Sequence, residues 1–118
     1  MDAGIIVTHQ NLLNDFFVGV PFTDCEKFLE GKNIVATRED EAIAIAVGAW
    51  FAGKTPLVYM QNSGLGNCFD IITSLLKPYK IDIELLVNNR TTPEHHALMG
   101  EKTTQLMKVI GFETIRYC

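Results

Sequence analysis

The stretch Pro-Leu-Val-Tyr-Met-Gln-Asn-Ser-Gly-Leu-Gly-Asn, residues 56–67, carries the clearest structural signal in the chain. Its first five residues are apolar without alternation, which is typical of a strand in a parallel sheet that is covered on both faces. A glycine turn follows at 63–67, and we expect a helix from about 67 to 76. This strand–turn–helix unit predicts an α/β fold with right-handed crossovers.

Similar units lie on either side of this stretch. Further strands are expected at residues 16–20, 33–36, 82–87 and 112–117. Helices are expected from 23 or 24 to 30, from an N-cap at Thr37 to residue 52, and from 101 to 110, ended by Gly31, Gly53 and Gly111. Residues 88–100 are expected to form a polar loop. The whole chain, 1–118, is therefore expected to be one domain, a three-layer α/β sandwich with a mostly parallel sheet.

Composition argues against several classes of partner. Ten Lys and Arg against fourteen Asp and Glu give a net charge of −4, which disfavours binding to nucleic acid or to an anionic membrane. No apolar run approaches the ~18 residues that span a bilayer, and residues 1–10 lack the pattern of a signal peptide. Cys25, Cys68 and Cys118 lie far apart and suit no metal site, so we expect free thiols in a cytoplasmic protein.

Ligands of parallel α/β sheets bind where the carboxyl ends of the strands meet. Four segments should converge at that edge: 19–23, 37–39, 61–64 and 89–100. The glycine turn at 63–67 lacks the Gly-Lys-Ser/Thr of a phosphate-binding loop, and Phe69 replaces the third glycine of a dinucleotide fingerprint. A turn that needs a positive φ is the simpler explanation, and a generic nucleotide-binding domain is the weaker alternative.

Two groups of titratable residues follow expected strands. Glu39, Asp40 and Glu41 open the helix that follows Thr37, and the helix dipole favours all three equally. Propensity therefore does not show which of them faces a site. His95 and His96 stand in the polar loop, where a solvated surface role and a role in proton transfer are both open.

The motif Thr-Arg-Glu-Asp-Glu-Ala-Ile-Ala-Ile-Ala-Val-Gly-Ala-Trp at 37–50 resembles the start of the catalytic helix in the pyrimidine-binding (PYR) domain of thiamine diphosphate-dependent enzymes. Residues 59–67 are similar to the phosphonopyruvate and sulfopyruvate decarboxylases of that family, and residues 16–21 resemble their first strand and loop. The segment 96–100 matches a His-x-x-x-Gly segment of the phosphonopyruvate enzymes. The resemblance covers residues 14–117.

The resemblance implies an activity. The family places a glutamate nine residues before a helix glycine, and counting back from Gly48 gives Glu39. Glu39 would hydrogen-bond N1′ of the aminopyrimidine ring and so activate thiamine diphosphate. The implied reaction is decarboxylation of 3-phosphonopyruvate or 3-sulfopyruvate to carbon dioxide and an aldehyde, and the sequence leaves the choice of substrate open.

Further site residues are implied by the same resemblance. The cofactor-binding candidates are Glu39, Asn62, Ser63 and Gly64. The substrate-binding candidates are Thr23, Asn62 and His95. The catalytic candidates are Glu39 and His96.

The resemblance also implies a partner. The family holds the diphosphate and Mg²⁺ in a second domain that begins with Gly-Asp-Gly, and this sequence contains no Gly-Asp-Gly. A β subunit or domain would therefore supply the metal site within a homo- or hetero-oligomer. PYR domains usually continue for another helix and strand beyond the position of Cys118, so we expect a C-terminally short domain. The alternative is an inactive PYR-like interaction module left by truncation.

Overall fold

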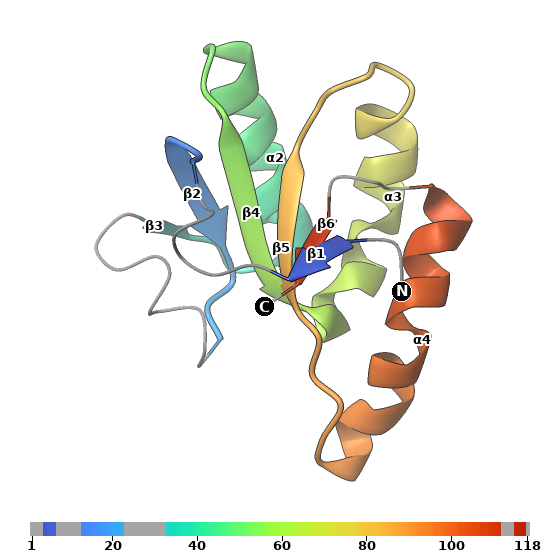
Figure 1. Cartoon of the computed structure of the whole chain (residues 1–118). Coiled ribbons are helices and arrows are strands. Elements are labelled where there is room, and N and C mark those ends of the chain that lie inside the picture. The colour runs from blue at the N-terminus through green and yellow to red at the C-terminus, as the bar shows by residue number, and fades with distance from the viewer. Residues whose placement is uncertain (1–3, 7–12, 23–32, 112–114, 118) are drawn as a thin grey trace.

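The computed structural model describes residues 4–6, 13–22, 33–111 and 115–117. Its strands form one six-stranded sheet in the order β1-β6-β5-β4-β2-β3 (Figure 1). Every neighbouring pair of strands is parallel. The strands are β1 (Gly4–Ile6), β2 (Phe16–Gly19), β3 (Asn33–Val35), β4 (Pro56–Gln61), β5 (Glu84–Asn88) and β6 (Ile115–Tyr117).

The parallel sheet confirms the predicted α/β fold class. The strands expected at 16–20, 33–36, 56–60 and 82–87 correspond to β2, β3, β4 and β5, and β6 occupies the end of the strand expected at 112–117. β1, which pairs with β6 from Gly4 to Ile6 at the edge of the sheet, was not predicted from the sequence. A three-residue strand is too short to show a period of its own, so only its pairing reveals it.

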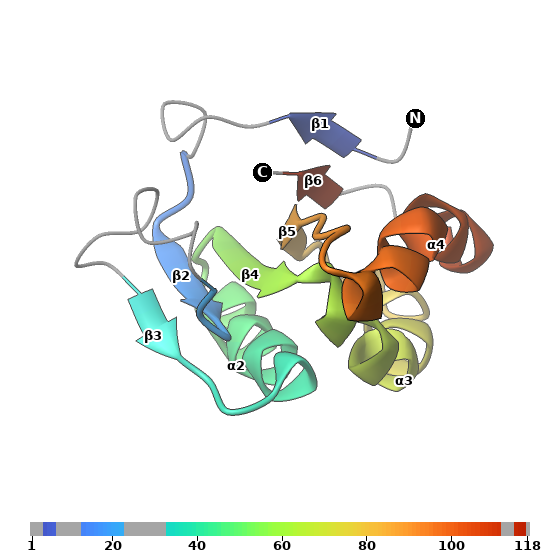
Figure 2. The same cartoon turned by 90° about the horizontal axis from the view of Figure 1, so that it is seen from below.

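The described helices lie on one face of the sheet (Figure 2). They are α2 (Glu39–Phe51), α4 (Glu94–Ile110) and a continuous helical segment over 62–76. That segment begins as a 3-10 helix (Asn62–Cys68), continues as α3 (Phe69–Ile71) and ends as a π-helix (Ile72–Leu76). No described helix is both long and apolar enough to cross a membrane.

Both faces of the sheet are buried, as the apolar sequence of β4 predicts. Val58 and Met60 belong to the core that the sheet shares with Ile43 of α2. Leu57 and Tyr59 alternate with them along the strand, so they point to the opposite face, and they are also 0 % exposed. The helix predicted from 23 or 24 to 30 lies outside the described residues.

Three expectations about helix ends and turns were wrong. The predicted polar loop at 88–100 is helical from Glu94, which places both histidines of the loop in the first turn of α4. Thr37 is not the N-cap of α2, because Arg38 holds that position without a side-chain cap bond. The turn at 63–67 is a 3-10 helix, and the described glycines with positive φ are Gly53 and Gly111. Gly111, with φ +63°, ends α4 as predicted.

Candidate functional site

The segments that follow β3, β4 and β5 converge at one edge of the sheet. This edge lies at the bottom of Figure 1 and faces the viewer in Figure 2. It gathers the start of α2, the 3-10 helix after β4 and the loop at 89–93 before α4. The predicted convergence is confirmed for these three segments, whereas Thr23 of the fourth segment lies outside the described residues.

Glu39 is the first residue of α2, and its side chain lies against the segment that follows β4. Its Oε1 atom accepts a hydrogen bond of 3.0 Å from Nδ2 of Asn67. A Cβ atom at Gly64 would overlap the Glu39 side chain and lie 2.6 Å from Oε2. Gly64 is therefore required for close approach to a carboxylate, which local turn statistics do not reveal.

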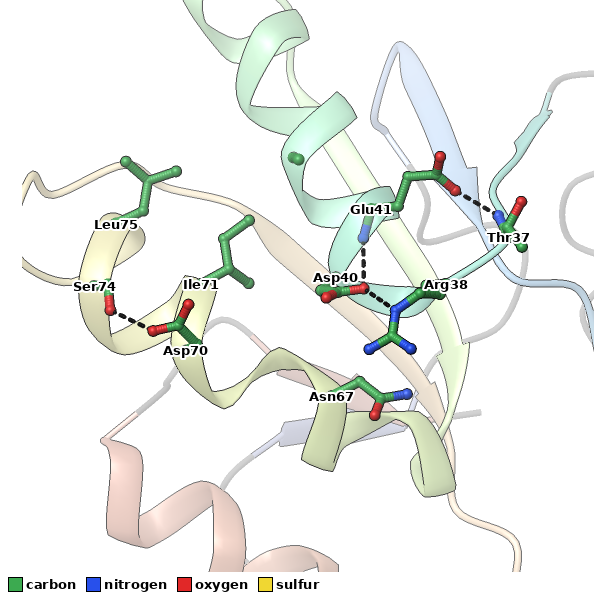
Figure 3. A pocket seen from close by; sticks show the side chains of 10 residues that line it. Thr37, Arg38, Asp40, Glu41, Asn67, Asp70, Ile71, Ser74 and Leu75 are labelled. Atoms are coloured by element: carbon green, nitrogen blue, oxygen red, sulfur yellow. Dashed lines mark hydrogen bonds and ion pairs between the residues drawn. The ribbon is translucent and has the colours of Figure 1, made fainter.

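The other two acids at the start of α2 have local partners (Figure 3). Asp40 pairs with Nε of Arg38 at 3.1 Å, and this hydrogen bond is the main cause that lowers the pKa of Asp40. Glu41 accepts the backbone N–H of Thr37 at 2.6 Å through Oε1. Within the described part of the chain, Glu39 is thus the only one of these three acids that bonds to another element.

A pocket of about 530 Å³ lies beside these residues, between the start of α2 and the helical segment after β4 (Figure 3). Arg38, Asp40 and Glu41 contribute charged groups to its wall. Asn67, Asp70 and Ser74 lie on the facing helical segment, where Ser74 donates a hydrogen bond of 2.8 Å to Asp70. Glu39 is outside the lining of this pocket, so the pocket adjoins the carboxylate without enclosing it.

Cys68, the last residue of the 3-10 helix after β4, is a buried free thiol. Its Sγ–H lies 3.5 Å from the carbonyl oxygen of Gly64. Burial, followed by the nearby charge of Glu39, raises the pKa of Cys68 to about 12. The thiolate is the reactive form of cysteine, so this thiol serves packing and not nucleophilic catalysis.

Asn62 is 0 % exposed, although it was expected to contact cofactor or substrate. Its Nδ2 atom lies 3.0 Å from Oδ1 of Asn89, 3.1 Å from the carbonyl of Arg90 and 3.0 Å from Oγ1 of Thr103. Its Oδ1 accepts the backbone N–H of Arg90 at 3.1 Å. Protein groups therefore satisfy both ends of the amide, which makes Asn62 a residue that positions the loop after β5.

A second cleft, of about 480 Å³, lies beside the loop that Asn62 positions. It is lined by Phe22, Gln61 and residues 88–93. Nη1 of Arg90 donates to Oε1 of Gln61 at 3.4 Å, and Nε2 of Gln61 donates to Oγ of Ser63 at 3.1 Å. Ser63 is exposed beside this cleft, so it remains a candidate for ligand contact.

The two histidines stack in the first turn of α4, with ring centroids 4.2 Å apart. His95 is exposed and His96 is half-buried. Desolvation, followed by the charges of Arg90 and His95, lowers the pKa of His96. The His96 imidazole is therefore mostly neutral at pH 7 and able to accept a proton. Among the described residues, no group of three or more His, Cys, Asp and Glu side chains could hold a metal ion.

Comparison with known proteins finds relatives among the decarboxylases. The chain is 36% identical over 128 aligned residues to sulfopyruvate decarboxylase subunit alpha of Methanothermobacter thermautotrophicus, which covers 98% of this chain and 72% of the relative. The subunit alpha of Methanocaldococcus jannaschii is 42% identical over 83 residues, covering 64% of this chain and 49% of the relative. Phosphonopyruvate decarboxylase of Streptomyces viridochromogenes is 37% identical over 86 residues, covering 68% of this chain and 21% of the relative. No family model matches the chain.

The parallel sheet and these relatives define the class as an α/β domain of the decarboxylases. Within that class, the chain belongs to the family of sulfopyruvate decarboxylase alpha subunits. The resemblance to the sulfopyruvate and phosphonopyruvate decarboxylases that was noted in the sequence is thereby confirmed. The chain spans 72% and 49% of the two alpha subunits described above, so the match to the whole relatives is partial.

Proposed function

We propose that this chain is the pyrimidine-binding subunit, or part of it, of a thiamine diphosphate-dependent decarboxylase. Its substrate would be 3-sulfopyruvate or 3-phosphonopyruvate, and its products carbon dioxide and an aldehyde. The observation that carries the proposal is the Glu39 carboxylate, fixed between Asn67 and Gly64 at the ligand-binding edge of the sheet. The names of the relatives, sulfopyruvate and phosphonopyruvate decarboxylase, support the class of substrate.

The residues around Glu39 fit the pyrimidine end of thiamine diphosphate. Among the described residues, the hydrogen bond to Glu39 engages Oε1, which leaves Oε2 to share a proton with a ring nitrogen. Gly64 packs closely against the Glu39 side chain and limits its movement. Bound thiamine diphosphate would supply the electron sink that accepts the electron pair when carbon dioxide leaves. Glu39 would hold the proton at Oε2 that sets the protonation state of the ring.

A second group is needed to move protons to and from the substrate. We assign this role to His96, because its lowered pKa keeps the imidazole neutral at pH 7. His95, stacked on His96, and Ser63, bonded to Gln61, are exposed and remain candidates for cofactor and substrate contact. Thr23 stays a candidate from the sequence resemblance alone.

The diphosphate and Mg²⁺ would be held by a partner. The described residues contain no acidic cluster suited to a metal, and the relatives are named as alpha subunits. We therefore propose a shared active site in a hetero-oligomer, to which this chain contributes the carboxylate and the partner contributes the metal. An inactive interaction module is the alternative if no such partner assembles.

The test is decarboxylation by a reconstituted pair. The full chain is co-expressed with a candidate partner that carries Gly-Asp-Gly, and carbon dioxide release from 3-sulfopyruvate and 3-phosphonopyruvate is measured with thiamine diphosphate and Mg²⁺. Glu39→Gln should lower kcat by about 100-fold or more, since it removes a proton-sharing group. Glu41→Gln is the matched control, because an amide oxygen still accepts the Thr37 N–H.

The outcomes separate the two hypotheses. Loss of activity in Glu39→Gln, with Glu41→Gln near the wild-type rate, supports the proposed decarboxylase. A Glu39→Gln variant that keeps the wild-type rate contradicts the role of Glu39. Assembly with the partner but no carbon dioxide release from either substrate favours the inactive module.

A further inference from the structure

The cleft beside Gln61 has the size and lining of a site for a small polar ligand. Its volume of about 480 Å³ lies within the range of small-molecule sites. Asn88, Asn89, Thr91 and Thr92 give it amide and hydroxyl groups, and Arg90 is its one charged residue. A cleft of this composition favours an anion with several acceptor oxygens.

The charge of Arg90 is uncompensated among the described residues. Its hydrogen-bond acceptors are neutral: the Thr92 carbonyl, 3.1 Å from Nε, and the Gln61 side chain, 3.4 Å from Nη1. Arg38, at the same edge, differs because it pairs with Asp40 at 3.1 Å. A guanidinium has five N–H donors, and these two bonds leave three for a ligand.

The backbone of Arg90 is fixed from inside the protein. Asn62, which is 0 % exposed, bonds both the N–H and the carbonyl of Arg90. Thr103 of α4 lies 3.0 Å from the same amide and ties it to the helix. An exposed arginine on a buried anchor loses little backbone freedom when it binds a ligand, which favours affinity.

The cleft is connected to the segment that contacts Glu39. Gln61 lines the cleft and bonds Ser63, which precedes Gly64 in the chain. Gly64 in turn contacts the Glu39 carboxylate. A substrate whose reacting carbon lies toward Glu39 could therefore extend its far end toward Arg90.

We propose that Arg90 binds the tetrahedral anionic group on C3 of the substrate, a sulfonate or a phosphonate, and so determines specificity. The inference rests on the proposed function, which supplies the substrate class. Arginine presents a planar fork that donates two parallel hydrogen bonds to the oxygens of such a group, whereas lysine offers a point charge. Asn62 sets the position of the fork without contacting the ligand.

Binding to the full chain tests this role separately from catalysis. The probe is 3-sulfopropanoate, which has the sulfonate and the carboxylate but no keto group, titrated by calorimetry. Arg90→Gln should weaken binding by about 10- to 100-fold, the range expected when a charge-assisted hydrogen bond is lost. The affinity of Arg90→Lys for the probe should lie between that of the wild type and that of Arg90→Gln. Lys102→Gln, which removes one exposed positive charge from α4, is the matched control and should bind like the wild type.

A second arm uses the reconstituted enzyme. Arg90→Gln should raise KM for 3-sulfopyruvate by about 10-fold or more and leave KM for pyruvate, which lacks the anionic group, unchanged. Equal affinity of wild type and Arg90→Gln for 3-sulfopropanoate overturns the proposal, as does a wild-type chain that does not bind this probe. If the pair decarboxylates neither substrate but Arg90→Gln still weakens probe binding, the proposed function fails and the assignment of Arg90 stands.

Discussion

The start of α2 and the loop after β5 lie at the same edge of the sheet, yet they are held in opposite ways. Glu39 is held from outside, by one hydrogen bond from an exposed asparagine and by contact with a glycine. Arg90 is held from inside, by a buried asparagine whose amide is bonded at both ends. The first arrangement fixes the Glu39 carboxylate with few contacts, and the second fixes the backbone of an exposed loop from the core.

The two asparagines should differ most when each is replaced by alanine. Asn62→Ala removes the hydrogen bonds that a fully buried amide makes to Asn89, to Thr103 and to the backbone of Arg90, and it leaves a cavity, so it should lower the free energy of unfolding by about 2–4 kcal/mol. Asn67→Ala removes one hydrogen bond at an exposed position and should cost less than about 1 kcal/mol. Urea denaturation of both variants measures the difference. Equal costs would show that the loop is not anchored by the buried amide.

The two glycines of the 3-10 helix provide the next contrast. A methyl group at Gly64 would overlap the Glu39 side chain, whereas one at Gly66 meets nothing within 4 Å. Gly64→Ala should destabilise the protein by about 1–3 kcal/mol and lower kcat of the reconstituted enzyme by about 10-fold or more, because the carboxylate is displaced.

Gly66→Ala is the control for helix propensity and should leave both quantities near their wild-type values. The same measurements serve for both variants, namely denaturation of the chain and carbon dioxide release by the pair. If Gly64→Ala behaves like Gly66→Ala, the contact with Glu39 does not position the carboxylate.

The smallest effect should come from the ion pair beside Glu39. Arg38 lowers the pKa of Asp40 in the folded protein, so this contribution to stability is present above the unfolded pKa of about 4. It is lost as the pH falls through the lower, folded pKa. The gap in stability between wild type and Asp40→Asn should therefore narrow as the pH falls from about 5 through the lowered pKa of Asp40. Arg38→Gln should reproduce the same pH dependence, and a gap that stays constant with pH would contradict the pairing.

The strands were predicted from apolar runs in the sequence. Glu39 was distinguished from Asp40 and Glu41 only through the family resemblance, whose motif places a glutamate nine residues before a helix glycine, here Gly48. The structure adds a physical reason for that choice, because the other two acids bond to Arg38 and to the Thr37 backbone.

The part of the site that was not predicted from the sequence depends on contacts between residues far apart in the chain. The bond between Asn62 and Thr103 spans 41 positions, and that between Asn67 and Glu39 spans 28. The hydrophobic periodicity of a sequence does not reveal such pairs. A loop was wrongly predicted at 88–100 because the polar residues Glu94, His95 and His96 gave no sign of the first turn of α4. Gly64 was likewise interpreted as a turn residue. Glycine is required at this position because the side chain of Glu39, from another helix, packs against it, and the local sequence does not show that contact.

The most direct test of the role of Glu39 is proton exchange on the cofactor. In the reconstituted complex with bound thiamine diphosphate and no substrate, the exchange of the C2 proton with deuterium is followed by quenched-flow NMR. We predict that Glu39→Gln slows this exchange by about 100-fold or more relative to wild type and to Glu41→Gln. Exchange at the same rate in all three proteins would contradict the account.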